Sequence, residues 1–253
     1  MTIKNRASYL NSDIKFLNKK IYEFDIRNAG LSIIKEFNLL PIEEILHIES
    51  LSKFESNIYV GKLRYNKEFS NNLSKYLRQT VSDFITINNI LEEDILSIKN
   101  DAVFITSNTN PIKQQTINNI FFKLENIFTS YYNLNNIEFY YKSDKNILIS
   151  KGINESIFED INTKYFVDWL KLIFRLMESS NKKALLKELK DFQYKYLNRL
   201  LPIQYYCEFK NDNWYRYSDY SVNNLEEDVK NKINIEYNYI SYILCLIKII
   251  VGM

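Results

Sequence analysis

The sequence is poor in the residues on which several common kinds of functional site depend. It contains two cysteines, one histidine, four glycines and three prolines in 253 residues. Two cysteines do not form the disulfide framework of a small secreted protein, and with a single histidine they exclude most zinc sites. So few glycines leave no glycine-rich phosphate-binding loop, and no nucleophile triad can be read from the sequence. The chemistry must therefore come from other residue types.

Charge and hydropathy exclude further classes of protein. The formal net charge of +2 is too small to indicate a class of binding partner. Any basic surface that binds a polyanion must therefore be local. With 46% hydrophobic residues the chain is not a disordered one, and it can fill one large domain or two small ones. Residues 1–6 lack the apolar core of a secretion signal, and the apolar run 239–251 is shorter than the roughly 20 residues that span a bilayer. We therefore expect a cytoplasmic protein, in the host cytoplasm if it is viral, with no membrane partner.

The hydrophobic pattern predicts an α+β fold in two parts. A strand is expected at 20–27, a long amphipathic helix at 67–90, and a tight hairpin with arms 95–99 and 102–106. From 153 onward the pattern turns mostly helical, so we expect one domain over 1–152 and another over 153–253. The other expected elements are helices over 31–41, 42–55, 160–177, 181–200 and 224–251, a strand over 57–64, and a hairpin over 137–150. The tyrosine-rich stretch 203–223 fits either a base-stacking surface or ordinary core.

Two aspartates stand out because each lies in or beside a short apolar strand. Asp25 lies near the end of strand 20–27, and Asp101 lies at or near the turn of the hairpin. A carboxylate in such a run is costly unless it is paired or binds a cation. If the two strands bring both carboxylates together, they repel each other and a divalent metal relieves the repulsion. Each residue also fits an ordinary role, Asp25 as the cap of the next helix and Asp101 as a turn residue.

The surroundings of both aspartates resemble the palm of family B DNA polymerases. In the first palm motif of that family an aspartate is followed seven residues later by Ser-Ile-Ile, and here Asp25 is followed by that triplet at 32–34. In the later motif, Tyr-Gly-Asp-Thr-Asp-Ser-Val-Phe, the second aspartate corresponds to Asp101 and the last two residues to 103–104, whereas Lys99 replaces the first aspartate. Weaker matches follow in order at 151–153 (Lys-Gly-Ile) and 235–240. The resemblance, which extends to phage-type polymerase-like proteins, implies a palm of antiparallel sheet with packed helices, and then a mostly helical thumb-like half.

The resemblance also implies a site that binds nucleotide and metal. Asp25 and Asp101 would be the catalytic carboxylates and would ligate two ions of Mg²⁺ or Mn²⁺. The nucleoside triphosphate and metal would be held by the turn between strand and helix, through the carbonyl of Ile26 and the amides of Asn28, Ala29 and Gly30.

A primer-template would contact basic residues outside that turn. By the resemblance, Lys151 would neutralise a phosphate of the primer or template. The charged face of helix 67–90 carries Lys75 and Arg78, which are either solvated charges or phosphate contacts. The expected partners are thus nucleic acid, nucleoside triphosphates and other phage replication or transcription proteins.

Departures from the family leave two functions open. The interval between the two aspartates has no evident fingers domain, the part of the polymerase whose Lys and Arg hold the triphosphate, and Gly30 replaces the tyrosine that excludes a ribose 2′-OH. The first function is a template-directed nucleotidyltransferase that uses two-metal phosphoryl transfer and tolerates ribonucleotides. The second is an inactive polymerase-derived subunit that binds nucleic acid or bridges a phage replication or transcription complex. Retention of both aspartates favours the first function, and the missing fingers domain together with Lys99 favours the second.

Overall fold

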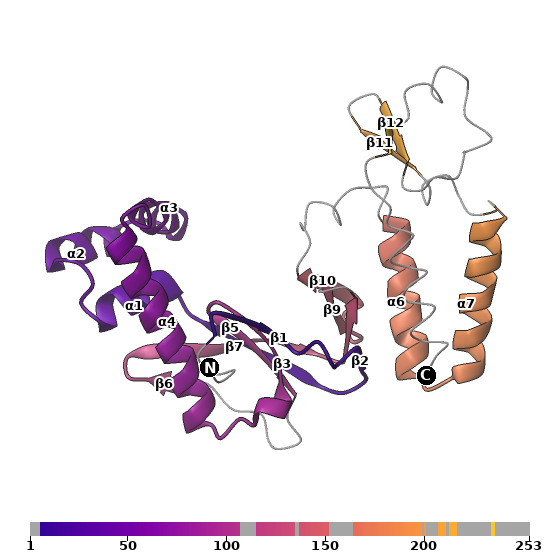
Figure 1. Ribbon diagram of the computed structural model, residues 1–253, viewed down its shortest axis with the longest axis horizontal. Coiled ribbons are helices and arrows are strands. Elements are labelled where there is room, and N and C mark those ends of the chain that lie inside the picture. The colour runs from indigo at the N-terminus through magenta and orange to yellow at the C-terminus, as the bar shows by residue number, and fades with distance from the viewer. Residues whose placement is uncertain are drawn as a thin grey trace. The chain divides into compact units, whose positions relative to one another are not determined.

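The computed structural model describes residues 6–106, 115–134, 137–151, 164–198, 200, 207–210, 213–216 and 234–235. The chain divides into two compact units. The first unit comprises Met1–Ile14 and Lys19–Phe128, and the second comprises Lys15–Asn18 and Thr129–Met253. Antiparallel sheets and helices occur in both units, so the expected α+β fold class is confirmed (Figure 1).

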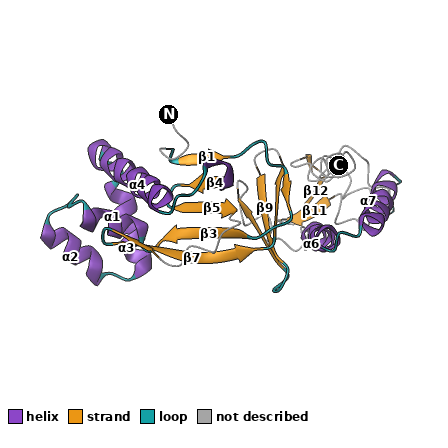
Figure 2. Ribbon diagram, turned by 90° about the horizontal axis from the view of Figure 1, so that it is seen from below, coloured by secondary structure: helices purple, strands orange, loops and turns teal. Residues whose placement is uncertain are grey.

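A six-stranded antiparallel sheet forms the centre of the first unit (Figure 2). Its strand order is β1-β4-β5-β3-β7-β6. The alternation of β3 explains its central place, because Phe24 and Ile26 enter the main hydrophobic core whereas Glu23 and Asp25 lie on the opposite face. The strands are β1 Ser8–Leu10, β3 Ile21–Ile26, β4 Ile95–Lys99, β5 Ala102–Thr106, β6 Gln115–Ile117 and β7 Ile120–Phe128.

Four α-helices follow β3 before the chain returns to the sheet. The longest, α4, begins at Asn66, whose side-chain oxygen accepts hydrogen bonds from the amides of Glu68 and Phe69. Phe84 of α4 stacks on Phe122 with ring centroids 4.1 Å apart, and so fixes the helix against the sheet. The other three helices lie together beyond the end of the strands where β3 leads into α1 (Figures 1 and 2). Their bounds are α1 Ala29–Glu36, α2 Ile42–Ser50, α3 Lys53–Leu63 and α4 Lys67–Ile87, and a 3₁₀ turn, η2, covers Glu92–Asp94.

The expected strand over 57–64 is wrong, because α3 extends to Leu63 and Arg64 is its C-cap. The reason lies just upstream, where Ser52 and Glu55 form a capping box. The Ser52 hydroxyl accepts from the Glu55 amide at 3.3 Å, and the Glu55 carboxylate accepts from the Ser52 amide at 3.0 Å. The expected helix over 42–55 is therefore two helices, α2 and the start of α3, with a break at Leu51. Local capping overrides the strand preference of β-branched residues such as Ile58.

The described residues of the second unit form two sheets and two helices. Tyr141 of its four-stranded sheet, of order β10-β9-β8-β2, stacks on Phe174 of α6 at 5.3 Å, and the Tyr141 hydroxyl accepts from Arg175 at 3.1 Å. Trp169 and Phe192 join α6 to α7. The elements are β2 Phe16–Leu17, β8 Ser130–Leu134, β9 Ile137–Lys142, β10 Ile147–Lys151, α6 Lys164–Glu178, α7 Lys182–Leu197, β11 Cys207–Lys210, β12 Asn213–Arg216 and β13 Asn234–Ile235.

The hairpin over 137–150 and the helices over 160–177 and 181–200 are confirmed within the described residues. Most of the expected helix over 224–251 lies outside them, and the part that is described, Asn234–Ile235, is a strand. Along the chain, the last boundary between the two compact units falls between Phe128 and Thr129. The division at 152 that the sequence predicts stays a prediction. Among the described residues, no helix is long and apolar enough to cross a membrane.

Candidate nucleotide and metal site

The structure brings Asp25 and Asp101 together at one end of the first unit's sheet. Asp25 stands opposite Ala102 in the β3–β5 register, and the amide of Ile26 donates to the carbonyl of Asp101 at 3.2 Å. The turn that carries Asp101 is tied down by Asn100, which has a left-handed φ of 55° and whose amide donates to the carbonyl of Ala7 at 2.8 Å. The predicted hairpin is therefore confirmed, with Asp101 in its turn.

Asp25 lies in an electrostatic environment that disfavours its charge. Burial raises the pKa of Asp25 to about 6, and the negative charges of Asp101, Glu23 and Glu125 contribute in that order. Lys123 stands opposite Asp25 on β7, and its ammonium group forms an ion pair with Glu125 at 2.6 Å. The positive charge of Lys123 is therefore partly offset by Glu125. A cation beside Asp25 and Asp101 would relieve this repulsion.

A helix N-terminus begins three residues after Asp25. Asn28 adopts a left-handed conformation with φ 49°, and no side chain among the described residues caps α1 there. The first amides of a helix carry partial positive charge and are suited to binding an anion. The turn at 28–30 therefore presents backbone donors next to the two carboxylates.

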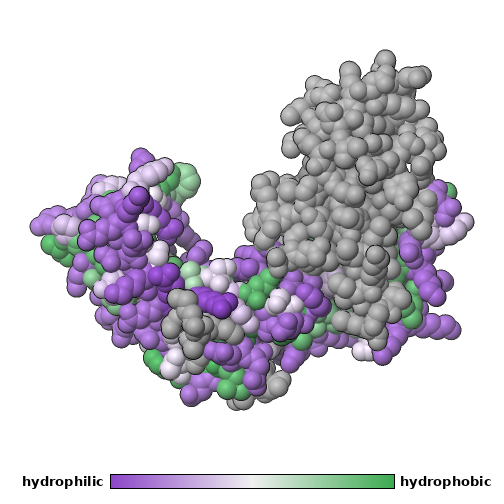
Figure 3. All heavy atoms as spheres, in the orientation of Figure 1, coloured by the Kyte–Doolittle hydropathy of each residue, from purple (hydrophilic) through white to green (hydrophobic). Residues whose placement is uncertain are grey.

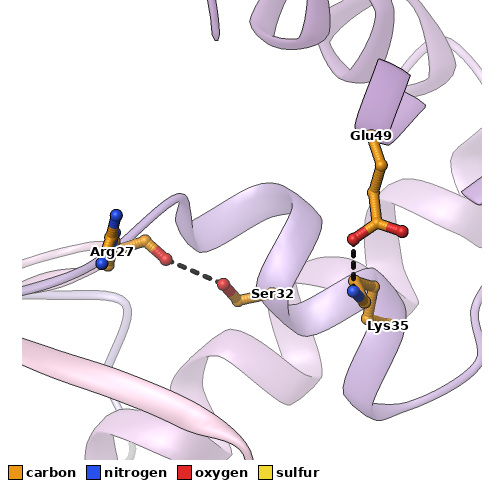
Figure 4. A network of polar contacts seen from close by, with 4 residues as sticks. All are labelled: Arg27, Ser32, Lys35 and Glu49. Atoms are coloured by element: carbon orange, nitrogen blue, oxygen red, sulfur yellow. Dashed lines mark hydrogen bonds and ion pairs between the residues drawn. The ribbon is translucent and has the colours of Figure 1, made fainter. Parts of the chain in front are cut away.

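Two polar contacts hold α1 in place behind this turn (Figure 4). The Ser32 hydroxyl donates to the carbonyl of Arg27 at 2.7 Å, which ties the first turn of the helix to the end of β3. The Lys35 ammonium group forms an ion pair with Glu49 of α2. Glu49 also lines the cleft described next, so Lys35 offsets one negative charge in its wall.

A cleft of about 560 Å³ opens beside the turn and the helix N-terminus. Its walls include Asn100, Asp101 and residues 28–31, together with Ser74 on α4. Another wall is a single face of α3, whose residues recur three or four positions apart: Lys53, Ser56, Asn57, Val60, Gly61 and Arg64. The volume falls within the range of small-molecule pockets, and the walls combine backbone donors, hydroxyl and amide groups, and two cationic side chains.

The cleft brings together part of the site that the sequence predicts. Asn28, Ala29, Gly30 and Asp101 line it. Asp25 adjoins Asp101 without lining the cleft. The Ile26 side chain is buried in the core, so only the backbone of that residue can serve a ligand.

None of the predicted nucleic-acid contacts is among the residues that line the cleft. Lys75 and Arg78 lie on α4 but are not among the cleft residues, and the Lys75 ammonium group sits 5.3 Å from the centre of the Tyr76 ring. Lys151 ends β10 in the second unit. Their proposed contacts with nucleic acid stay predictions.

Lys53 and Arg64 are cleft residues that sequence reasoning missed. In a strand over 57–64, successive side chains would point to opposite faces, and Arg64 would share no face with Lys53. At the C-terminal end of α3, Arg64 lies on the same side of the helix as Lys53 and lines the cleft with it. The Ser-x-x-Glu capping signal at 52–55 was the available clue.

Close packing of α1 against α3 explains why position 30 is a glycine. A Cβ added to Gly30 would come within 3.1 Å of Val60 Cγ1, so α1 and α3 approach closely at this point. A side chain at position 30 would therefore have to displace Val60.

The carboxylates suit a cation that arrives with phosphate. Among the described residues, no group of three or more His, Cys, Asp or Glu side chains could hold a metal ion by itself. Mg²⁺ commonly uses only one or two carboxylates and completes its shell with waters and substrate phosphates. Asp25 and Asp101 fit that pattern, because burial and then the charge of Asp101 raise the pKa of Asp25, and a cation beside them would favour its ionised form.

Comparison with known families adds one relationship. A family model described as Bacteriophage PBS1 gene 130 protein matches residues 1–252. The chain belongs to this family. It is therefore a bacteriophage protein, as the resemblance to phage-type proteins implied. No curated protein matches the chain.

Proposed function

We propose that this phage protein is a template-directed nucleotidyltransferase resembling a small family B DNA polymerase. The observation that carries the proposal is the convergence of Asp25 and Asp101 next to a cleft that also contains the α1 N-terminus and two cationic side chains of α3. Carboxylates, backbone amides and cations in one place are the parts that phosphoryl transfer requires.

The carboxylates provide the metal ligands in this proposal. Bound Mg²⁺ or Mn²⁺ would lower the pKa of an attacking hydroxyl and neutralise charge on the transferred phosphoryl group. Asp25 must lose its proton before it can ligate, and its pKa of about 6 lies below neutral pH, so the ionised form prevails in the cell. Asp101 holds the second ligand position from the rigid hairpin turn.

The triphosphate would lie between α1 and α3. The backbone amides at 28–30 would bind phosphate oxygens at the start of α1. Lys53 and Arg64 would supply two positive charges from the α3 wall of the cleft. In this arrangement α3 does the work that the resemblance assigns to a fingers domain.

The sugar would meet little steric discrimination at position 30. Gly30 has no side chain, and Val60 already occupies the space that a Cβ would need. A ribose 2′-OH would therefore meet no side chain from residue 30 itself, and ribonucleotides would be accepted where the sugar lies clear of Val60.

One observation favours the alternative function, an inactive subunit that binds nucleic acid or bridges a phage replication or transcription complex. Lys99 stands where the polymerase motif has its first aspartate, and the described residues offer no third carboxylate that completes a metal cluster. Fewer acidic ligands weaken metal binding, and a lysine adds a like charge next to the cation.

A primer-extension assay separates the two functions. The wild-type protein is incubated with primed template, dNTPs or rNTPs, and Mg²⁺ or Mn²⁺, beside Asp25→Asn, Asp101→Asn and the control Asp168→Asn, an exposed aspartate of α6. The proposal expects extension by wild type and control, and a loss of several orders of magnitude in both site variants. No extension by any protein, with filter binding of the primed template unchanged in every variant, supports the inactive subunit instead.

A further inference from the structure

The surface of α3 next to the cleft carries exposed aromatic side chains. Phe54 is 74% exposed, Tyr65 is 89% exposed and Ile58 is 44% exposed. Together with Gly61 they follow one another at spacings of three or four residues. Phe54, Ile58 and Gly61 lie on one side of α3, and Tyr65 continues their line in the turn directly after the helix ends at Leu63. Single exposed apolar residues are common on protein surfaces, whereas neighbouring aromatic side chains that are largely exposed to solvent indicate a binding surface. We call these four residues the aromatic stripe. Hydrophobic residues are visible on the surface over α2 and α3 (Figure 3).

Positive charges border the aromatic stripe on both sides. Lys53 and Arg64 directly precede Phe54 and Tyr65 and lie on its cleft side. Lys62 is exposed on the other side, because each residue advances 100° around a helix. The acidic residue on that side, Glu55, accepts hydrogen bonds from Ser52 in the capping box.

We propose that the aromatic stripe binds a single strand of nucleic acid, with bases stacked on Phe54 and Tyr65 and phosphates facing Lys62, on the side away from the cleft where Lys53 and Arg64 face the triphosphate. Aromatic platforms bordered by cations are how proteins hold single strands without reading their sequence. At 1.5 Å per residue the helical part of the stripe extends about 14 Å from Phe54 to the end of α3 at Leu63, and Tyr65 follows in the turn, so the stripe has room for more than one base. This inference deepens the proposed function and rests on it only for the class of partner.

A protein partner is the competing occupant of this surface. Ile42 and Leu46 of α2 are also exposed, and an apolar partner could cover them with the stripe. The centres of protein interfaces are, however, depleted of lysine, whereas the stripe has cations along its edges. Charge complementarity therefore favours a polyanion that also carries aromatic rings.

The test measures binding of a short fluorescein-labelled oligodeoxythymidylate to the full-length protein by fluorescence anisotropy. Phe54→Ala and Tyr65→Ala should each weaken binding about tenfold, because each removes one stacking platform. Phe54→Leu and Tyr65→Leu should be equally weak, since leucine retains apolar area without an aromatic face. Tyr194→Ala is the matched control, an exposed tyrosine of α7 at 61%, and should bind as wild type.

A salt titration tests the cations separately. Lys62→Ala should make the slope of log affinity against log salt shallower by about 0.7, whereas Lys190→Ala, an exposed lysine of α7, should leave it unchanged. Wild-type affinity in the alanine variants would overturn the proposal, and so would full rescue by leucine. Self-association of the wild type in sedimentation, abolished by Phe54→Ala with Tyr65→Ala, would assign the surface to a second copy instead.

The inference and the proposed function fail in different ways. Asp25→Asn should keep oligonucleotide binding and lose only primer extension. If the wild-type protein binds the oligonucleotide through the stripe but extends no primer, the proposed function is wrong. If it extends a primer while the stripe variants bind the oligonucleotide as wild type does, the inference about the stripe is wrong.

Discussion

The charge of Asp101, in a hairpin turn, raises the pKa of Asp25, on the neighbouring strand β3. Seventy-six positions along the chain separate the two residues, and the antiparallel pairing of β3 with β5 brings them together. Burial is the larger cause of the shift, and the Asp101 charge is the first of the like charges that add to it.

Asp101→Asn should lower the pKa of Asp25 from about 6 toward its ordinary value of 3.8 without reaching it, because burial persists. The measurement is a carboxyl-carbon NMR titration of Asp25. Asp168→Asn, on α6, is the control and should leave the pKa of Asp25 unchanged. A pKa of Asp25 that is the same in wild type and Asp101→Asn would show that the two carboxylates are not neighbours.

Asp25→Asn should make the metal-free protein more stable above pH 6. The pKa of Asp25 is about 6 in the folded protein and 3.8 in the unfolded chain. The contribution of protonated Asp25 to the free energy of unfolding is therefore fully present below pH 3.8 and is lost as the pH rises to about 6. Asparagine stays neutral, and its advantage should shrink as the pH falls from 7 to 4. Urea unfolding across that range measures it, and Mg²⁺ should raise the stability of wild type but not of the variant. Equal pH dependence in both proteins would contradict the assignment.

Gly30→Ala and Gly61→Ala should have opposite effects on stability. At Gly30 the added methyl group meets Val60 Cγ1 at 3.1 Å, and such overpacking costs about 1–3 kcal/mol. At Gly61 nothing lies within 4 Å, so alanine should stabilise α3 by up to about 1 kcal/mol through helix propensity. Chemical denaturation compares them. Val60→Ala should largely rescue Gly30→Ala, and the absence of coupling in that double-mutant cycle would show that α1 and α3 are farther apart.

Lys53→Ala and Arg64→Ala should each weaken binding of a fluorescent ATP analogue about tenfold at low salt, because each removes one positive charge from the cleft wall. Lys187→Ala on α7 is the control for a general loss of charge. The effect should shrink as the ionic strength rises. Undiminished affinity in both cleft variants would remove α3 from the proposed triphosphate site.

Local sequence signals predicted much of the frame around the site. The apolar alternation at 20–27, the tight turn between 99 and 102, and the helical period of α4, α6 and α7 each identified an element that the structure contains. These signals succeed because each depends on neighbours within a few residues. The strand expected at 57–64 is wrong because the capping box at Ser52 sets the start of α3 and outweighs the strand preference of the β-branched residues in that segment.

By itself the amino-acid sequence determined which segments form β3, the hairpin and the long helix, and it placed a carboxylate at Asp25 and another at Asp101. Only the tertiary structure decided that these two lie side by side and that Lys53 and Arg64 share a cleft with Gly30 and its neighbours. The reason is physical: a side chain's own strand or helix follows from nearby residues, whereas strand pairing and helix packing join positions far apart in the chain.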